Sequence, residues 1–149
     1  MKDKPVLGNN IREITSFAAR TKLKRPLIGA NIAAGFPSPA QDYIEKSIDL
    51  NEQLISHPAA TFFVRVEGDS MNGSGIFDND VLIVDRALEA VDGCVIVAVL
   101  NSEFTVKRLR IRKDCWSLLP SNPAFPEIII TEDTDFSVWG VVTYCLHKL

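Results

Sequence analysis

The chain has 149 residues, of which 46% are hydrophobic and 23% are charged, a balance typical of one globular domain with a substantial core. No apolar run approaches the roughly 20 residues of a membrane helix, and the first residues lack the apolar segment of a secretory signal, so we expect a cytoplasmic protein. The cysteines Cys94, Cys115 and Cys145 are widely spaced and odd in number, which argues against a disulfide framework and favours small core residues.

The net charge of −3 hides an uneven distribution. Residues 1–25 hold seven Lys and Arg against two Asp and Glu, which gives +5 and leaves −8 on the rest of the chain. A basic N-terminal arm can bind nucleic acid, dock on its own acidic body or stay solvated, and charge alone leaves all three open. The acidic body is a poor surface for phosphates, so we expect no strong direct DNA binding by it.

The N-terminal third of the chain shows two kinds of pattern. Ile11, Ile14 and Phe17 have roughly helical spacing, which predicts a short amphipathic helix over residues 10–20. The stretch 26–39 has no charge, three prolines and two glycines, and is typical of an extended linker. Its many small and apolar residues suit a segment that binds in a cleft better than a passive spacer.

Two capping patterns follow the linker. Ser38, with Pro39 and Gln41 behind it, predicts a helix that begins near Pro39. Asp49 with Glu52 three residues later predicts a second helical start, which ends before Pro58. From residue 61 the apolar period changes to two, and this predicts a mostly β body with strands over 61–67, 81–85, 93–100, 103–112, 115–119, 127–131 and 136–145.

One of these strands carries a lysine on its apolar face. Alternation along residues 103–112 puts Lys107 on the same face as Leu109 and Ile111, and the tight turn expected at 101–102 makes its position rigid. Buried lysines are rare and usually have a task, although a lysine on a half-buried strand can also extend its amine into solvent. Burial would favour the neutral amine by lowering the lysine pKa, and a neutral amine can act as a base.

A serine follows the strand 61–67, on the turn Gly68-Asp69-Ser70-Met71. A serine hydroxyl becomes a good nucleophile when a neighbouring base takes its proton, and Lys107 is a candidate for that base. The backbone N–H groups of Asp69 and Ser70 are candidates for the oxyanion hole that acyl transfer needs, although Asp69 can also simply stabilise the turn. The pair makes a Ser-Lys hydrolase the leading hypothesis.

Other chemistries lack a pattern in this sequence. There is no glycine-rich phosphate loop, and neither histidine has a cysteine or carboxylate at ligand spacing. We therefore expect no metal and no nucleotide cofactor.

Several blocks of the sequence closely resemble the UmuD family, whose members are relatives of the LexA repressor. The likeness runs in order from residue 34 to about residue 145 and includes the spacing between the serine and the lysine. It implies a mainly β fold: a LexA-like and signal-peptidase-like body of about seven strands, with a short helix at its start and an extended N-terminal arm. The blocks are 35–43, 68–71, 82–85, 103–107 and 140–142.

The resemblance also implies a function. Such a protein is a self-cleaving serine peptidase that acts once, when a RecA filament on single-stranded DNA stimulates it, and here the bond would be Ala34-Gly35. Ser70 would be the nucleophile and Lys107 the base. Residues 1–34 would be removed from the body, 35–149, and the trimmed homodimer would join a UmuC-like Y-family DNA polymerase in SOS mutagenesis, which is translesion synthesis after DNA damage.

Two alternatives of other classes stay open at this point. The body can be a protein-protein adaptor with an inert dyad, which its acidic charge favours, or the chain can be a small LexA-like DNA-binding regulator, which rests only on the basic arm. The arm is too short for a helix-turn-helix domain. About ten more residues precede the cleavage site here than in the best-known UmuD proteins, so the docking of the arm does not carry over from the family.

Overall fold

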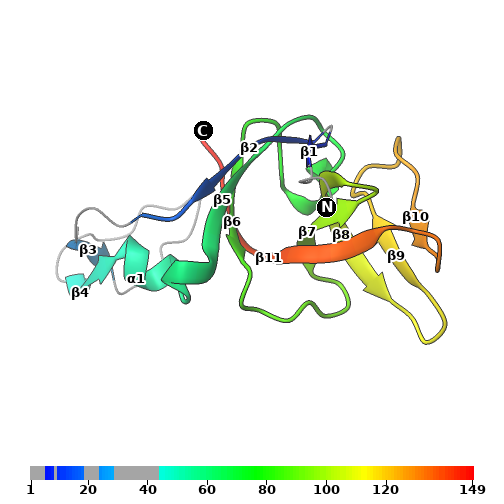
Figure 1. The fold of residues 1–149 in the computed structure, drawn as a ribbon. Helices are drawn as coiled ribbons and strands as arrows, with labels where there is room; N and C mark the ends of the chain where they lie inside the picture. Colours follow the sequence, from blue (N-terminus) through cyan, green and yellow to red (C-terminus); the bar gives the residue numbers. More distant parts are fainter. Residues whose placement is uncertain (1–5, 9, 19–23, 29–43) are drawn as a thin grey trace. The chain divides into compact units, whose positions relative to one another are not determined.

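The structure is a computed structural model that describes residues 6–8, 10–18, 24–28 and 44–149. The chain divides into two compact units, residues 1–17 together with 57–149, and residues 18–56. The larger unit is a curled β-sheet, and the described part of the smaller unit holds a two-stranded sheet and a short helix (Figure 1). The predicted mainly β fold is confirmed.

Within the described part of the chain, nine strands form the sheet of the larger unit. Their order is β10-β9-β8-β7-β11-β6-β5-β2, and neighbours along this path are antiparallel. The remaining strand, β1, pairs in parallel with β8. The bounds are β1 Val6–Leu7, β2 Ile11–Ser16, β5 Thr61–Val66, β6 Val81–Asp85, β7 Val95–Leu100, β8 Glu103–Ile111, β9 Trp116–Leu119, β10 Ile128–Ile130 and β11 Phe136–Leu146.

Each of the seven strands predicted from the period of two has a counterpart, from β5 to β11. The turn between β7 and β8 is also where it was predicted. Asn101 and Ser102 have φ values of 48° and 69°, which is the left-handed geometry of a tight hairpin turn. Short 3-10 turns at Pro58–Ala60 and Asn72–Ser74 flank β5 on its two sides in the sequence.

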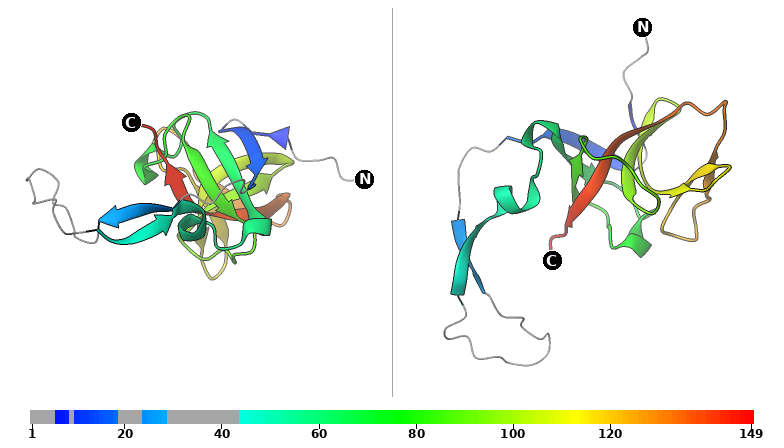
Figure 2. Two further views of the ribbon diagram at one scale, coloured as in Figure 1. Left: turned by 90° about the vertical axis from the view of Figure 1, so that its left-hand side faces the viewer. Right: turned by 90° about the horizontal axis from the view of Figure 1, so that it is seen from below.

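The sheet curls because its longest strand, β11, pairs with a different neighbour along each of its halves. The first half of β11 pairs with β7 and the second half with β6. The register shifts between Val138 and Gly140 and again between Val142 and Tyr144, and such bulges bend a strand and increase its twist. Figure 2 shows the resulting curvature of the sheet from two further directions.

The helix predicted over residues 10–20 is wrong, because Ile11–Ser16 form strand β2, paired with β5. A shift of register between Ile11 and Glu13 explains the misleading pattern. The extra residue lets Ile11 and Ile14, three positions apart, both pack against the same core cluster, as they would on a helix. The spacing that indicated a helix is therefore that of a bulged strand.

The structure of the smaller unit contradicts some of the elements predicted from the sequence and confirms one of them. Strand β3, Lys24–Ile28, pairs with β4, Ile44–Asp49, so the linker predicted from residue 26 begins as a paired strand. The helix predicted from Pro39 is wrong over β4, and its start lies outside the described residues. The second helical start is confirmed: Asp49 caps helix α1, Leu50–Leu54, and accepts a hydrogen bond from the Asn51 N–H at 2.9 Å.

Two clusters of buried side chains form the core of the larger unit. Strand β8 contributes Phe104 and Val106 to one cluster and Leu109 to the other, so its two faces are both covered. The first cluster also contains Ile11, Val64, Val66, Met71, Ile76, Leu82, Val84 and Val97, and the second contains Ile96, Ala98, Leu118 and Val141.

The three cysteines are free thiols and half-buried, so they are less enclosed than core residues. Cys145 packs against the first cluster and Cys94 against the second. No helix in the described ranges has the length and apolar character needed to cross a membrane.

Ile11 tests whether the N-terminal arm belongs to the folded core. Its side chain is 2% exposed within the first cluster, so Ile11→Ala leaves a cavity and is expected to lower the free energy of unfolding by about 2 to 5 kcal/mol. Denaturant unfolding followed by tryptophan fluorescence measures this loss. The control Ser16→Ala, at an exposed position of the same strand, should change the value by less than about 0.5 kcal/mol. Equal effects of the two variants would contradict the core position of Ile11.

Candidate functional site

Ser70 lies in the loop that joins β5 to β6, and this loop is held at both ends. Gly68 has a φ of 82°, in the left-handed region that favours glycine, and its N–H donates to Asp78 Oδ1 at 2.8 Å. The Ser70 side chain is only 6% exposed. A serine that follows a fixed turn in this way keeps its hydroxyl in one place.

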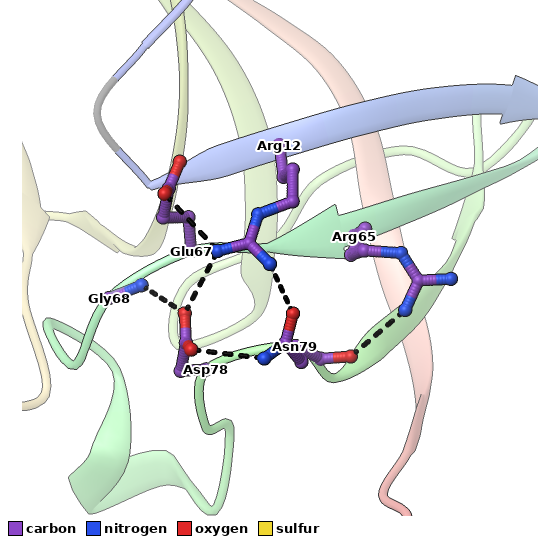
Figure 3. A network of polar contacts seen from close by, with 6 residues as sticks. All are labelled: Arg12, Arg65, Glu67, Gly68, Asp78 and Asn79. Carbon is purple, nitrogen blue, oxygen red and sulfur yellow. Dashed lines mark hydrogen bonds and ion pairs between the residues drawn. The ribbon is translucent and has the colours of Figure 1, made fainter.

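An arginine from the N-terminal arm bridges the two ends of this loop (Figure 3). The Arg12 guanidinium lies 3.2 Å from Glu67 Oε1 and 3.8 Å from Asp78 Oδ1, and it also donates to Asn79 Oδ1. Arg65 donates to the carbonyl of Asn79 at 3.3 Å. Each exposed pair contributes little by itself, but together they tie β2 to both ends of the loop.

The structure brings Lys107 to this serine. Lys107 is 8% exposed, and its Nζ lies 3.5 Å from Ser70 Oγ, the long limit of a hydrogen bond. The same Nζ donates to the Val106 carbonyl at 3.0 Å and to Thr105 Oγ1 at 3.2 Å. A neutral amine has two N–H bonds and one lone pair, so with both hydrogens on these acceptors its lone pair faces the serine hydroxyl.

Burial determines the charge of this amine. Desolvation lowers the pKa of Lys107 from 10.5 to about 8, because water no longer stabilises the ammonium. Its three hydrogen-bond partners are a hydroxyl, a second hydroxyl and a carbonyl, all uncharged. A substantial fraction of Lys107 is therefore neutral near pH 8 and able to accept a proton.

The backbone around the serine is fixed from outside the loop. The Ser121 N–H donates to the Ser70 carbonyl at 2.8 Å, and Asn122 Nδ2 donates to the Asp69 carbonyl at 3.0 Å. The N–H groups of Asp69 and Ser70 donate to no acceptor among the residues that the structure describes. They remain candidates for the oxyanion hole, and the hydrogen bonds to the carbonyls of the same two residues hold this part of the backbone in place.

A cleft of about 290 Å³ opens beside the serine and the lysine. It is lined by the loop residues Glu67, Gly68, Asp69 and Ser70, by Leu100, Glu103, Phe104, Thr105 and Lys107, by Phe125 and Ile128, and by Gly8 and Asn10 of the arm. The predicted cleavage site, Ala34 and Gly35, lies outside the described residues.

Two polar contacts of this site were missed from the sequence. Thr105 orients the lysine, and its place two residues before Lys107 on the same strand is a signal that could have indicated it. Asn10 donates to the Val106 carbonyl at 2.9 Å and lies 3.4 Å from Ser70 Oγ. No local pattern predicts this second contact, because 96 residues separate Asn10 from Val106.

A polar cluster around the buried Asp80 holds the end of the serine loop that leads into β6. Asp80 accepts from the Phe77 N–H at 2.8 Å and from Cys145 Sγ at 3.3 Å, and it lies 2.6 Å from His147 Nδ1. Burial, reinforced by Asp80, raises the pKa of Cys145 to about 12, so this thiol stays protonated. It is no nucleophile, and the cluster is structural.

No group of three or more His, Cys, Asp or Glu among the described residues could hold a metal ion.

Comparisons with known proteins show which family the chain resembles. The Peptidase S24-like family model matches residues 26–143. The chain is 47% identical over 123 residues to protein MucA of Salmonella typhimurium, a match that covers 81% of this chain and 83% of MucA. It is 46% identical over 123 residues to protein SamA of the same species, covering 83% and 85% of the two chains.

A LexA repressor, that of Xylella fastidiosa, is 42% identical over 130 residues, which cover 87% of this chain and 60% of the repressor. The match to the family model spans well over half of the chain, and the MucA and SamA matches confirm the UmuD resemblance. The chain therefore belongs to the Peptidase S24-like family, as one of its UmuD-type members.

Proposed function

We propose that this chain is an SOS mutagenesis protein that cuts itself once, between Ala34 and Gly35. The observation that carries the proposal is the buried contact between Lys107 Nζ and Ser70 Oγ, with a lysine pKa of about 8. Membership of a peptidase family and the likeness to MucA and SamA support it. So does the small and apolar character of the sequence on both sides of the bond, which lets an extended backbone approach a serine closely.

The reaction follows from the protonation states. Neutral Lys107 takes the proton of Ser70, whose Oγ attacks the Ala34 carbonyl carbon. The oxyanion that forms is stabilised by the N–H groups of Asp69 and Ser70, and Lys107 then gives its proton to the leaving amine of Gly35. Water hydrolyses the acyl-enzyme, with Lys107 again as base. The contact of 3.5 Å must shorten for proton transfer, as is common for catalytic hydrogen bonds in resting enzymes.

The proposed partners follow from the family. A RecA filament on single-stranded DNA would stimulate the cut, and the trimmed homodimer would join a UmuC-like Y-family polymerase for translesion synthesis. The charge distribution supports a change of partner after cleavage. Residues 1–25 carry +5 and the rest of the chain −8, so loss of the arm makes the remaining body strongly acidic.

Self-cleavage is tested with the purified full chain, incubated at alkaline pH or with RecA, single-stranded DNA and nucleotide. Fragments of 34 and 115 residues should appear on a gel. Ser70→Ala and Lys107→Ala should each abolish them, because one removes the nucleophile and the other the base. The matched controls Ser137→Ala and Lys113→Ala, both at exposed positions, should cleave like the parent chain. Cleavage that persists in both dyad variants would exclude the proposed chemistry.

The pH dependence of the rate tests the role of Lys107. Because only the neutral amine is a base, the rate of cleavage without RecA should rise roughly tenfold between pH 7 and pH 9 and level off above the pKa of about 8. Time courses on gels in buffers of constant ionic strength measure this profile. A rate that keeps rising about tenfold per pH unit from pH 8 to about pH 10 would indicate an ordinary, solvated lysine and contradict the assignment.

A mutagenesis assay in cells distinguishes a self-cleaving enzyme from a non-catalytic adaptor. In a strain that depends on this chain for damage-induced mutagenesis, Ser70→Ala should abolish the mutagenesis, and a chain expressed directly as residues 35–149 should restore it. An adaptor with an inert dyad would instead tolerate Ser70→Ala without loss.

A further inference from the structure

The strand that carries Lys107 has a backbone edge that its neighbours in the main path leave uncovered. Strand β7 pairs with β8 from Glu103 to Arg108, but β9 on the other side pairs only with Arg108–Ile111. Residues 103–106 therefore present their second edge to some other segment. This edge leads directly to the dyad, because Lys107 is the next residue.

The N-terminal segment lies on that edge. Strand β1 pairs with it in parallel, with Val6 opposite Glu103 and Leu7 opposite Phe104. Asn10 then pairs with Val106 through its side chain: its Oδ1 accepts from the Val106 N–H at 3.2 Å, and its Nδ2 donates to the Val106 carbonyl at 2.9 Å. The Asn10 amide thus satisfies both backbone groups of Val106, as a partner strand would.

The fit of this segment is close. A Cβ on Gly8 would lie 2.0 Å from the Phe104 carbonyl oxygen, so only glycine allows this approach. Asn10 is 7% exposed, and its Nδ2 reaches to 3.4 Å from Ser70 Oγ. Gly8 and Asn10 both line the cleft that holds Ser70 and Lys107.

A peptide that Ser70 is to cut has to reach the same place. An extended substrate gains its affinity largely by adding a strand to an exposed sheet edge, and residues 103–106 would be such an edge beside the nucleophile once the N-terminal segment leaves it. We propose that residues 6–8 and Asn10 compete with the cleavage linker for the edge of β8 at 103–106, so that the uncut chain keeps its own dyad covered. This inference rests on the proposed function.

The N-terminal segment is bound to this edge weakly enough to be displaced. Strand β1 has only two residues, and the side chains of Val6 and Leu7 are 59% and 46% exposed, so the segment buries little apolar surface. The next residues are anchored differently, because Ile11 lies in the core and Arg12 bridges the serine loop. Residues 6–8 and Asn10 can therefore leave the edge while β2 stays in the sheet.

Gly8→Ala tests the competition in the full chain, because the added methyl cannot coexist with the Phe104 carbonyl. The variant should expose the Val106 N–H, whose hydrogen exchange should accelerate at least tenfold. Self-cleavage without RecA should become about threefold to tenfold faster, as expected for the loss of one or two hydrogen bonds. Asn10→Ala should act in the same direction without any clash, and Ser16→Ala serves as the control for both.

The opposite results would overturn the inference. Faster exchange at Val106 with unchanged or slower cleavage would mean that Asn10 positions Ser70 instead of competing with the linker. Unchanged exchange in both variants would mean that residues 6–8 and Asn10 do not occupy the edge.

A binding experiment separates this inference from the proposed function, because it requires no cleavage. A labelled peptide of residues 26–41 is titrated into full-length Ser70→Ala chains, with and without Gly8→Ala, and binding is followed by fluorescence anisotropy. The peptide should bind about threefold to tenfold more tightly when Gly8 is replaced. Equal affinity, or no binding to either chain, would overturn the competition, whereas absence of cleavage in the parent chain would overturn only the proposed function.

Discussion

The site depends on one unusual constraint, a buried lysine amine with no charged hydrogen-bond partner among the described residues. A pKa of about 8 in place of 10.5 means that the folded protein disfavours the ammonium by roughly 3 kcal/mol relative to water. The fold bears this cost because both faces of β8 are covered and because the amine has three uncharged partners, Ser70, Thr105 and the Val106 carbonyl. A carboxylate at hydrogen-bond distance would remove the cost and the basicity together, since it would restore the charged form.

Strands β1 and β2 of the N-terminal arm are part of the nine-stranded sheet. Ile11 lies in the core, Arg12 bridges the ends of the serine loop, and Asn10 contacts Ser70 and Val106. The proposed cut at Ala34-Gly35 would break one covalent bond but none of these contacts. Release of the arm is then a separate event from cleavage, with its own free energy, and a partner that needs the bare edge of β8 or β5 would have to compete for it.

Much of this architecture could be predicted from the sequence because the signals are local. Alternation located all seven strands of the body, and it correctly placed Lys107 on the face that also holds Leu109. The predicted pair of Ser70 and Lys107 also lie close together, with Oγ and Nζ 3.5 Å apart, although their catalytic role stays a prediction. These successes share one cause, which is that a period of two in a sheet with covered faces leaves few alternative registers.

The failures have non-local causes. The bulge in β2 gave Ile11 and Ile14 a helix-like spacing, and β4 became a strand because it pairs with β3, about 20 residues earlier in the chain. The contact of Asn10 with Val106 spans 96 residues and has no local signal at all. What sequence reasoning lacked was knowledge of which segments would become neighbours.

The position of β11 has a consequence for when activity can arise. The serine loop belongs to the β5–β6 side of the sheet and the lysine to the β7–β8 side. In the sheet path these sides are joined by β11, which follows all the other described strands along the chain, and outside this path the N-terminal strands β1 and β2 pair with β8 and β5. During synthesis the ribosome has already made both reactive side chains while the strand between their two halves is still missing. We therefore expect the contact between Ser70 and Lys107 to be fully formed only after this last strand is inserted.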